Sequence, residues 1–189
     1  MTLLSPVRPM LAALLVTAFG AMSAAAAPWK LDAAKSQLSF SGTQTGAAFK
    51  GHFTRFSTQI DFDPDHPETS HINVVIDPAS AVTGDAQRDG ALPGKDWFDI
   101  AQFPQAQFAT IAIRKTGANA YAATGTLTLR GVAKPVTLPF TLAITGTTAH
   151  AKGHLNLART LFGVGQGTWS SGQWVALDVG VDVDIVATL

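Results

Sequence analysis

Apolar and polar residues alternate most regularly near the C-terminal end of the chain, in the stretch QWVALDVGVDVDIVATL. The apolar members of this alternation are Val175, Leu177, Val179, Val181, Val183 and Ile185. Asp178, Asp182 and Asp184 fall between them. Because successive side chains of a strand point to opposite faces, a period of two with acids on one side predicts one wet face and one buried face. We therefore expect a strand over residues 175–185 in a sheet whose inner face is apolar.

The same alternation recurs at short intervals through the rest of the chain. It is found in residues 38–40, 56–62, 72–76, 106–112, 127–129, 136–142 and 155–157. Turn signals lie between several of these runs, at Asp63-Pro64-Asp65, Lys115-Thr116-Gly117, Arg130-Gly131 and Thr145-Gly146. Short strands separated by turns that suit hairpins are typical of an antiparallel sandwich or barrel. Together with the last strand, the pattern predicts an all-β domain of about eight strands.

One long segment interrupts the series of strands. Residues 79–104 show no alternation, contain several glycines and prolines, and hold a dense group of charges. A segment of this length inside a compact domain is usually functional when it is not disordered. Its apolar side chains Leu92, Trp97, Phe98 and Phe103 argue against disorder. We expect this insert to form at most short helices and to cover one side or end of the sheet, with its aromatic residues inward and its charges in water.

Composition narrows the class of protein. The chain has 189 residues, which fits one domain, and its 13 basic residues balance 13 acidic ones. A net charge of zero argues against a nucleic acid or an anionic membrane held by bulk electrostatics. The chain has no cysteine, which excludes disulfides and a thiol nucleophile. Stability must therefore come from burial of an apolar core.

The N-terminal segment is typical of a secretory signal peptide. Its only charged residue is Arg8, which is followed by an apolar run over residues 10–21 and then by small residues rich in alanine. The run is shorter than the ~20 residues that a membrane-spanning helix needs. We expect residues 1–26 to be removed, with cleavage within residues 24–27, and residues 27–189 to form the mature domain. In a Gram-negative bacterium this export predicts a periplasmic location.

Several motifs follow one another in a distinctive order. They are Phe53 and Phe56 followed by IDFDP at 60–64, RDGAL at 88–92, Trp97-Phe98, FPQAQF at 103–108, GTLTLRGVAKPVTLPF at 125–140 and RTLFGVG at 159–165. In this combination the chain resembles the YceI-like family of polyisoprenoid-binding, lipocalin-like proteins, over essentially the whole mature domain. Family members commonly carry two phenylalanines where this chain has Trp97-Phe98, a difference that keeps an aromatic side chain at the position.

The resemblance implies an eight-stranded antiparallel lipocalin-like β-barrel with a short helical insert at about residues 79–104. It also implies that the barrel binds, stores or transports a polyisoprenoid lipid, such as an isoprenoid quinone or a polyprenyl phosphate, without catalysis, catalytic cofactor or metal. The residues expected to contact the lipid are Phe40, Phe53, Phe56, Ile76, Arg88, Leu92, Trp97, Phe98, Phe103, Phe108, Phe140, Arg159, Phe162 and Trp169. The alternation by itself slightly favours an interior filled by side chains, and only the resemblance favours a cavity.

Two arginines leave a choice between a ligand contact and a structural role. Arg88 could meet a phosphate or quinone oxygen at the mouth of a barrel, because its planar fork suits such acceptors. The alternative, which base rates favour, is that Arg88 and Asp89 pin the insert through local hydrogen bonds or ion pairs. Arg159 precedes an apolar pair and a glycine-rich turn, so it is expected near the barrel end. Because a buried arginine must be paired, structural pairing and ligand contact are equally open for it.

Enzymatic alternatives have little support in the sequence. His150 and His154 are spaced to share one face of a strand, but no third ligand lies at metal-binding spacing. The serine-nucleophile elbow and the phosphate-binding loop are both missing. A lipid-modifying hydrolase that uses Asp89 and a histidine is therefore the weakest hypothesis. A stronger second hypothesis is an interaction module that docks on a membrane redox protein and handles its quinone, and a homodimer is also open.

Overall fold

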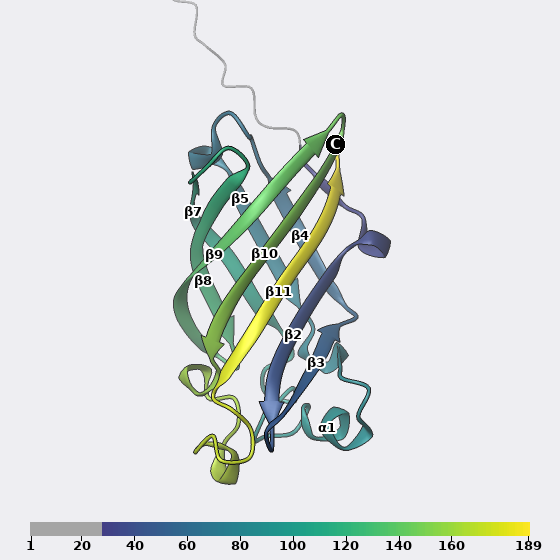
Figure 1. Ribbon diagram of the computed structural model, residues 1–189, viewed down its shortest axis with the longest axis vertical. Coiled ribbons are helices and arrows are strands. Elements are labelled where there is room, and N and C mark those ends of the chain that lie inside the picture. Colours follow the sequence, from purple (N-terminus) through teal and green to yellow (C-terminus); the bar gives the residue numbers. More distant parts are fainter. Residues whose placement is uncertain (1–27) are drawn as a thin grey trace, which may run out of the picture.

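Eleven strands form one sheet that curls into a barrel in the computed structural model, which describes residues 28–189 (Figure 1). The signal peptide expected over residues 1–26 lies outside the described residues. The strands are β1 (Lys30–Leu31), β2 (Gln37–Gln44), β3 (Ala47–Phe53), β4 (Phe56–Asp61), β5 (His71–Ile76), β6 (Ala81–Val82), β7 (Ala106–Lys115), β8 (Ala120–Leu129), β9 (Val132–Thr145), β10 (Thr148–Ala158) and β11 (Asp178–Thr188). The helices described are α1 (Ala86–Ala91) and the 3-10 turns η1 (Ala33–Lys35), η2 (Pro67–Thr69), η3 (Pro78–Ser80), η4 (Arg159–Phe162) and η5 (Gly167–Trp169).

The strands lie in the order β4-β5-β7-β8-β9-β10-β11-β2-β3-β6, and all pairs are antiparallel. Strand β1 joins the two sides of the curled sheet, because it pairs with β11 and the backbone N–H of the preceding Trp29 donates to the carbonyl of Ile60 in β4 at 2.8 Å. The predicted all-β antiparallel barrel with a short helical insert is confirmed. The described residues hold eleven strands rather than about eight, because β1, β3 and β6 were not predicted.

Strand β3 escapes the apolar pattern because glycine occupies one of its inward positions. Gly51 lies opposite Phe40 of β2, and a Cβ atom on Gly51 would lie 2.4 Å from the Phe40 ring. In the same way Gly42 of β2 lies opposite Phe49 of β3, with 2.9 Å between its ideal Cβ and that ring. Each aromatic ring therefore covers the glycine of the neighbouring strand, a device that lets a glycine sit inside a sheet without leaving a hole.

The last strand begins later than the alternation predicted. Strand β11 starts at Asp178, whereas the expectation placed Val175 within it. Val175 forms an isolated bridge with Gln44, and the N–H of Ala176 donates to the carbonyl of Thr43. Residues 174–176 thus run along the tip of the β2–β3 hairpin and not in the register of β11, although their apolar alternation continues that of the strand.

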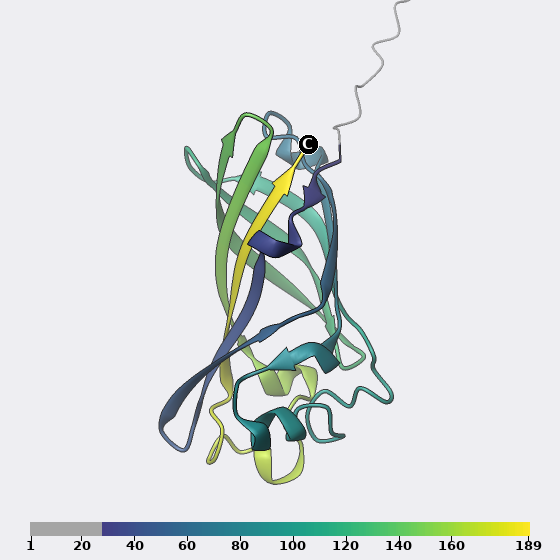
Figure 2. The same cartoon turned by 90° about the vertical axis from the view of Figure 1, so that its right-hand side faces the viewer.

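Two buried clusters occupy the two ends of the barrel. At the closed end, the cluster contains Trp29, Phe62, Ile113 and Tyr121, and the indole N–H of Trp29 donates to the Phe62 carbonyl at 2.9 Å. At the other end, here called the mouth, no strand closes the barrel; α1 and the segment that holds η4 and η5 lie across it instead (Figure 2). The insert therefore covers one end of the barrel, as the sequence predicted. The buried cluster of the mouth includes Leu92 and Phe98 from the insert and Phe162 from η4.

Strands β9 and β10 separate toward the mouth. They pair only between residues 140–145 and 148–153, although β9 pairs with β8 over residues 132–141. The part of β9 that lacks a partner on the β10 side contains Pro135 and Pro139, which is typical of strand edges because proline has no N–H to donate. The turn η4 follows directly after β10 and contacts β9. Side chains of the mouth cluster, and not backbone hydrogen bonds, therefore join the two strands there.

Candidate ligand-binding site

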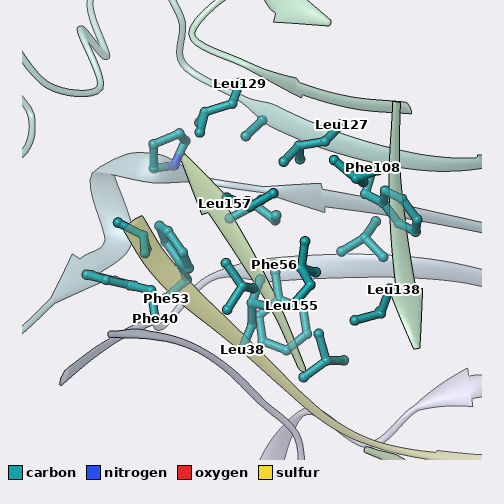
Figure 3. Close-up of a pocket in the computed structure, with 18 of the residues that line it drawn as sticks. Leu38, Phe40, Phe53, Phe56, Phe108, Leu127, Leu129, Leu138, Leu155 and Leu157 are labelled. Carbon is teal, nitrogen blue, oxygen red and sulfur yellow. The ribbon is translucent and has the colours of Figure 1, made fainter. Parts of the chain in front are cut away.

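A cavity of about 380 Å³ runs along the inside of the barrel from the closed end to the mouth. Its wall is almost wholly apolar, and every strand from β2 to β11 except β6 contributes to it (Figure 3). From β11 the wall takes Val179, Val181, Val183, Ile185 and Ala187, a stretch of about 26 Å at ~3.3 Å per residue. The first four keep partial accessibility although they point inward, because they face this cavity. The interior is therefore hollow, whereas the alternation by itself had slightly favoured a filled one.

The cavity opens at the mouth. The lining residues of the closed end, such as Trp29, Phe62 and Ala187, are buried, whereas lining residues of α1, such as Asp85 at its N-cap and Gln87, are exposed. Nearly all polar lining side chains lie at this end, on α1, the β2–β3 hairpin and η4. The site thus combines a long apolar interior with one polar rim, an arrangement suited to an amphiphile.

The structure brings together all but one of the side chains predicted to contact a ligand. Those that line the cavity are Phe40, Phe53, Phe56, Ile76, Arg88, Leu92, Trp97, Phe98, Phe108, Phe140, Arg159, Phe162 and Trp169. Phe103 does not line it, so that part of the prediction is wrong. Its ring packs on the turn between β8 and β9, where it approaches Gly131 and lies 6.0 Å from the guanidinium of Arg130. Phe103 therefore anchors the end of the insert to a hairpin outside the cavity.

Aromatic side chains join the insert to the barrel at the mouth. The ring of Phe98 lies 6.1 Å from that of Phe53 in β3, which in turn lies 5.2 Å from Phe40 in β2. The other aromatic of the pair, Trp97, lies 5.5 Å from Trp169 in η5. Contacts at these separations are favourable between tilted rings. The mouth is thus covered from two sides by aromatic side chains that also face the cavity.

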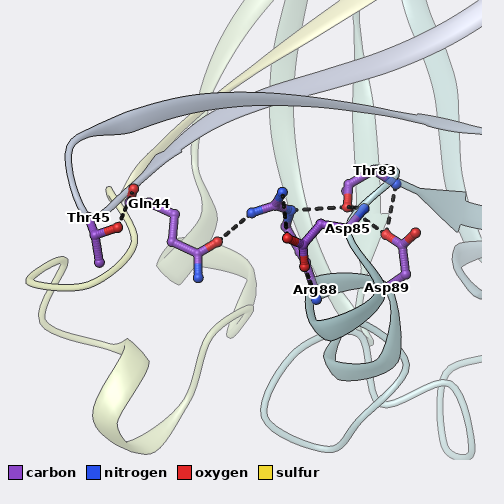
Figure 4. A network of polar contacts seen from close by, with 6 residues as sticks. All are labelled: Gln44, Thr45, Thr83, Asp85, Arg88 and Asp89. Atoms are coloured by element: carbon purple, nitrogen blue, oxygen red, sulfur yellow. Dashed lines mark hydrogen bonds and ion pairs between the residues drawn. The ribbon is translucent and has the colours of Figure 1, made fainter.

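Arg88 connects α1 to the tip of the β2–β3 hairpin (Figure 4). Its Nε donates to Thr83 Oγ1 at 3.0 Å, its Nη1 donates to Gln44 Oε1, and its guanidinium lies 4.3 Å from the centre of the Phe49 ring. Its ion pair with Asp85 is long, at 4.0 Å. The predicted pinning of the insert is therefore present, yet Arg88 also faces the cavity, so the structural role does not exclude a ligand contact.

Asp89 fixes the start of the insert and does not reach the cavity wall. Its Oδ1 accepts hydrogen bonds from the backbone N–H of Thr83 at 2.7 Å and from the Thr83 hydroxyl at 2.6 Å. These hydrogen bonds, led by that of the hydroxyl, hold the pKa of Asp89 below its ordinary value. A carboxylate stabilised in its charged form by local donors is a weak general base, so the geometry gives the hydrolase hypothesis no support.

Arg159 is buried, with 4% of its surface exposed, and the acceptors of its guanidinium are backbone carbonyls. It donates to the carbonyl oxygens of Ala176, Val164, Gly165, Trp169 and Val175. Desolvation lowers the pKa of Arg159, but a guanidinium remains charged at neutral pH. Of the two roles left open by the sequence, structural pairing is therefore observed. Its guanidinium also lies 5.3 Å from the Trp97 ring on the cavity wall.

Comparison with known proteins assigns the family. Residues 29–187 match the model of the YceI-like domain. The chain belongs to the YceI-like family. A UPF0312 protein of Yersinia pestis (strain Pestoides F) is 39% identical over 123 residues, which make up 64% of this chain and 64% of that protein. The matched region thus spans less than two thirds of the length of this curated relative.

Solved structures share the YceI-like fold. BcnA of Burkholderia cenocepacia is 39% identical, with a TM-score of 0.81 over 84% of this chain and 100% of that one. The YCEI protein of Campylobacter jejuni is 25% identical, with a TM-score of 0.69 over 76% of this chain and 86% of that one. A polyisoprenoid binding domain from Saccharophagus degradans is 16% identical, with a TM-score of 0.65 over 85% of this chain and 97% of that one, and shares the fold alone.

Many side chains that line this YceI-like cavity were not among the predicted contacts, and three of them are Gln44, Phe49 and Thr58. Gln44 and Phe49 belong to the unpredicted β2–β3 hairpin and reach the cavity beside Arg88. Thr58 lies in β4, in phase with the inward-facing Phe56 and Ile60. Its buried hydroxyl has no hydrogen-bond partner. The inward phase was visible in the sequence, and it was the signal that could have placed Thr58 on the wall.

The outer face of β10 and β11 in this YceI-like barrel carries a polar ladder far from the cavity. His150 contacts Asp184 at 2.5 Å, Lys152 contacts the same carboxylate at 3.1 Å, and His154 contacts Asp182 at 2.7 Å. The two histidines do share a face, as their spacing predicted. In the part of the chain that the structure describes, no group of three or more His, Cys, Asp or Glu residues is arranged to hold a metal ion.

None of the helices formed by residues 28–189 has the length and apolar character that a helix needs to cross a bilayer.

Proposed function

We propose that this protein binds one long-chain isoprenoid lipid inside its barrel and stores or carries it without chemical change. The observation that carries the proposal is the cavity itself, whose wall is apolar apart from Thr58 and the polar side chains at its rim. Its volume of about 380 Å³ falls within the range of small-molecule sites. The name of the Saccharophagus neighbour, a polyisoprenoid binding domain on the same fold, agrees with this class of ligand.

The energetics favour a long chain over a short apolar molecule. Each methylene group removed from water contributes ~0.8 kcal/mol, so about ten buried groups contribute ~8 kcal/mol. Association and ordering cost roughly 4–15 kcal/mol. A short ligand in this apolar channel would not offset that cost, whereas a chain that extends along the length of β11 would.

The polar rim sets the direction of the lipid. Arg88, Gln44 and Gln87 lie at the mouth, and the closed end offers only apolar side chains and the indole of Trp29, whose N–H is already bound. The isoprenoid tail is therefore inside and the head group is at the rim. An isoprenoid quinone or a polyprenyl phosphate meets this requirement, because a guanidinium can donate to a quinone carbonyl and can bind a phosphate through two N–H groups.

Native mass spectrometry of the protein purified from its own host tests the proposal most directly. The expected result is an adduct that solvent extraction releases and identifies as a prenyl lipid. A protein free of adduct that also fails to bind added prenyl quinone and polyprenyl phosphate would contradict the proposal. If the lipid extracted after incubation with the protein is chemically altered, the proposal that the protein binds it without catalysis would be contradicted.

A pair of alanine substitutions localises the ligand. Ala151→Phe places a ring in the cavity, whereas Ala143→Phe places the same ring on the exposed outer face of β9. The first substitution is expected to lower the amount of bound lipid about tenfold or more, since it removes room for several methylene groups, and the second to leave it unchanged. Thermal unfolding checks that both variants fold. Equal lipid content in the two folded variants would place the ligand elsewhere.

We also propose that the protein works in the periplasm after removal of its first residues. The support is the order of Arg8, the apolar run and the alanine-rich stretch. Intact-mass measurement of the purified protein is expected to give an N-terminus within residues 25–28, and a retained Met1 would contradict export by this route. The membrane redox partner and the homodimer stay predictions.

A further inference from the structure

One segment at the mouth has no charged side chain. Residues 160–177, TLFGVGQGTWSSGQWVAL, contain no Asp, Glu, Lys, Arg or His. They are preceded by Arg159, which is buried, and followed by Asp178. Three large apolar side chains of this mouth segment are nevertheless exposed: Leu161 at 60%, Leu177 at 38% and Trp174 at 49%. An uncharged segment that exposes leucine and tryptophan marks an interaction surface and not an ordinary solvated loop.

The mouth segment is continuous with the rim of the cavity. Trp169 lines the cavity, and the carbonyl of Trp174 accepts from the backbone N–H of Thr45 at 2.8 Å in the β2–β3 hairpin. The neighbouring Gln44 bears the contact with Arg88. The mouth segment, which carries the exposed apolar side chains, therefore adjoins the rim of the cavity.

Much of the mouth segment's backbone is hydrogen-bonded within the protein. Arg159 accounts for five of its carbonyls, and the carbonyl of Asp96 accepts the N–H groups of Gly165 and Gln166 at 2.8 and 2.7 Å. The turns η4 and η5 account for further groups, among them the N–H of Trp169, which donates to the carbonyl of Gln166. Irregular backbone enters an apolar phase more easily when protein groups bind its polar atoms, and these hydrogen bonds lower that cost for the mouth segment.

We propose that the mouth segment docks on the surface of a lipid bilayer, with Leu161, Trp174 and Leu177 immersed at the interface and the cavity open toward the membrane. Tryptophan prefers this interface, and the lack of charge avoids the cost of placing ions at that depth. Because the mouth segment has no cation and the chain has no excess of positive charge, the bilayer surface it fits is zwitterionic and binding is insensitive to salt. The purpose of docking, exchange of the lipid in the cavity, rests on the proposed function.

A protein partner fits the same surface less well. Protein interfaces are rimmed by charged and polar side chains that set orientation and register, and the mouth segment supplies uncharged ones only. Of the other large apolar side chains exposed in residues 28–189, Val82 lies in β6 beside the insert, whereas Ile111 and Ile144 lie away from the opening. Ile144 lies near the C-terminal end beside the closed end, and Ile111 lies at the irregularity in the pairing of β7 with β8. These two residues provide matched controls.

Cosedimentation with phosphatidylcholine vesicles tests the proposal. Removal of two immersed side chains, Leu161→Ser with Trp174→Ser, is expected to weaken binding to the vesicles about tenfold or more, whereas Ile111→Ser with Ile144→Ser leaves it unchanged. Binding of the unsubstituted protein is expected to stay constant from low to high salt. Loss of binding in salt, binding only to anionic vesicles, or an equal effect of the two double variants would overturn the proposal.

A second measurement separates docking from lipid binding. Each variant is loaded with a prenyl quinone from detergent micelles and its lipid content is measured after extraction. The expected result is full loading of the Leu161/Trp174 variant, together with slow transfer of its quinone to vesicles. Quinone in the unsubstituted protein without vesicle binding would overturn docking and leave the proposed function intact. A failure of the unsubstituted protein to load with either the prenyl quinone or a polyprenyl phosphate would overturn the proposed function, and with it the purpose assigned to docking.

Discussion

The closed end and the mouth of the barrel are built by different means. At the closed end, Ile113 of β7 is fully buried, and Tyr121 of β8 stacks on Phe140 of β9 with ring centres 5.4 Å apart. At the mouth, short helices and irregular backbone cross the barrel, and two arginines hold them in place. Period-two patterning is enough to produce the first arrangement, whereas the second depends on specific polar side chains. The polar rim of the cavity lies at the end that strands do not close, where loops carry its side chains.

The largest losses of stability are expected from Arg159→Met at the mouth and from Ile113→Ala at the closed end. Loss of the guanidinium leaves several buried carbonyls without donors, and loss of the isoleucine leaves a hole at the closed end, so each is expected to lower the free energy of unfolding by about 3 kcal/mol. Urea titration measures this quantity. Hydrogen exchange should separate the two, because only Arg159→Met is expected to raise exchange in residues 160–177. The same exchange pattern in both variants would show that the two ends are not independent.

A smaller effect is expected from Arg88→Met, which keeps the aliphatic stem over Phe49 and removes the hydrogen bonds to Gln44 and Thr83. Loss of these contacts should cost about 1 kcal/mol of stability and should speed the release of bound lipid several-fold, since they tie α1 to the hairpin at the rim. The release rate of a fluorescent prenyl lipid is the measurement. Arg55→Met serves as the control, because Arg55 forms an exposed ion pair with Asp77 away from the cavity. Equal release rates in the two variants would contradict a role of Arg88 at the rim.

The smallest effect is expected on the outer wall. Hydrogen bonds from His150 and Lys152 hold the pKa of Asp184 below its ordinary value. A carboxylate whose folded-state pKa is lowered adds stability above its unfolded pKa of about 4, and that stability is lost as the pH falls through the lowered value. Because this pair is well exposed, the contribution is small and salt screens it. At low salt, Asp184→Asn should therefore slightly reduce the loss in free energy of unfolding that occurs on acidification. Lipid content should not change.

The sequence predicted the strands of the barrel better than the contacts at its mouth. Most strands were found because they alternate, and β3 was missed because Gly51, covered by Phe40, replaces an apolar side chain at an inward position. The insert was recognised as a cover, yet Phe103 was misplaced because its ring packs on Gly131, which the sequence pattern does not bring near. The sequence left the role of Arg159 open, since its acceptors are backbone carbonyls, which every residue has.

The separation of β9 from β10 gives the wall mechanical compliance. A continuous ring of hydrogen-bonded strands resists widening, because any increase in the circumference of the barrel breaks backbone hydrogen bonds. Toward the mouth, β9 and β10 are not hydrogen-bonded to each other, and apolar side chains around Phe162 fill the gap between them. Widening there deforms side-chain contacts, which are individually weak and re-form after a small slide. The inner width of the barrel is thus adjustable near its opening and fixed at its far end.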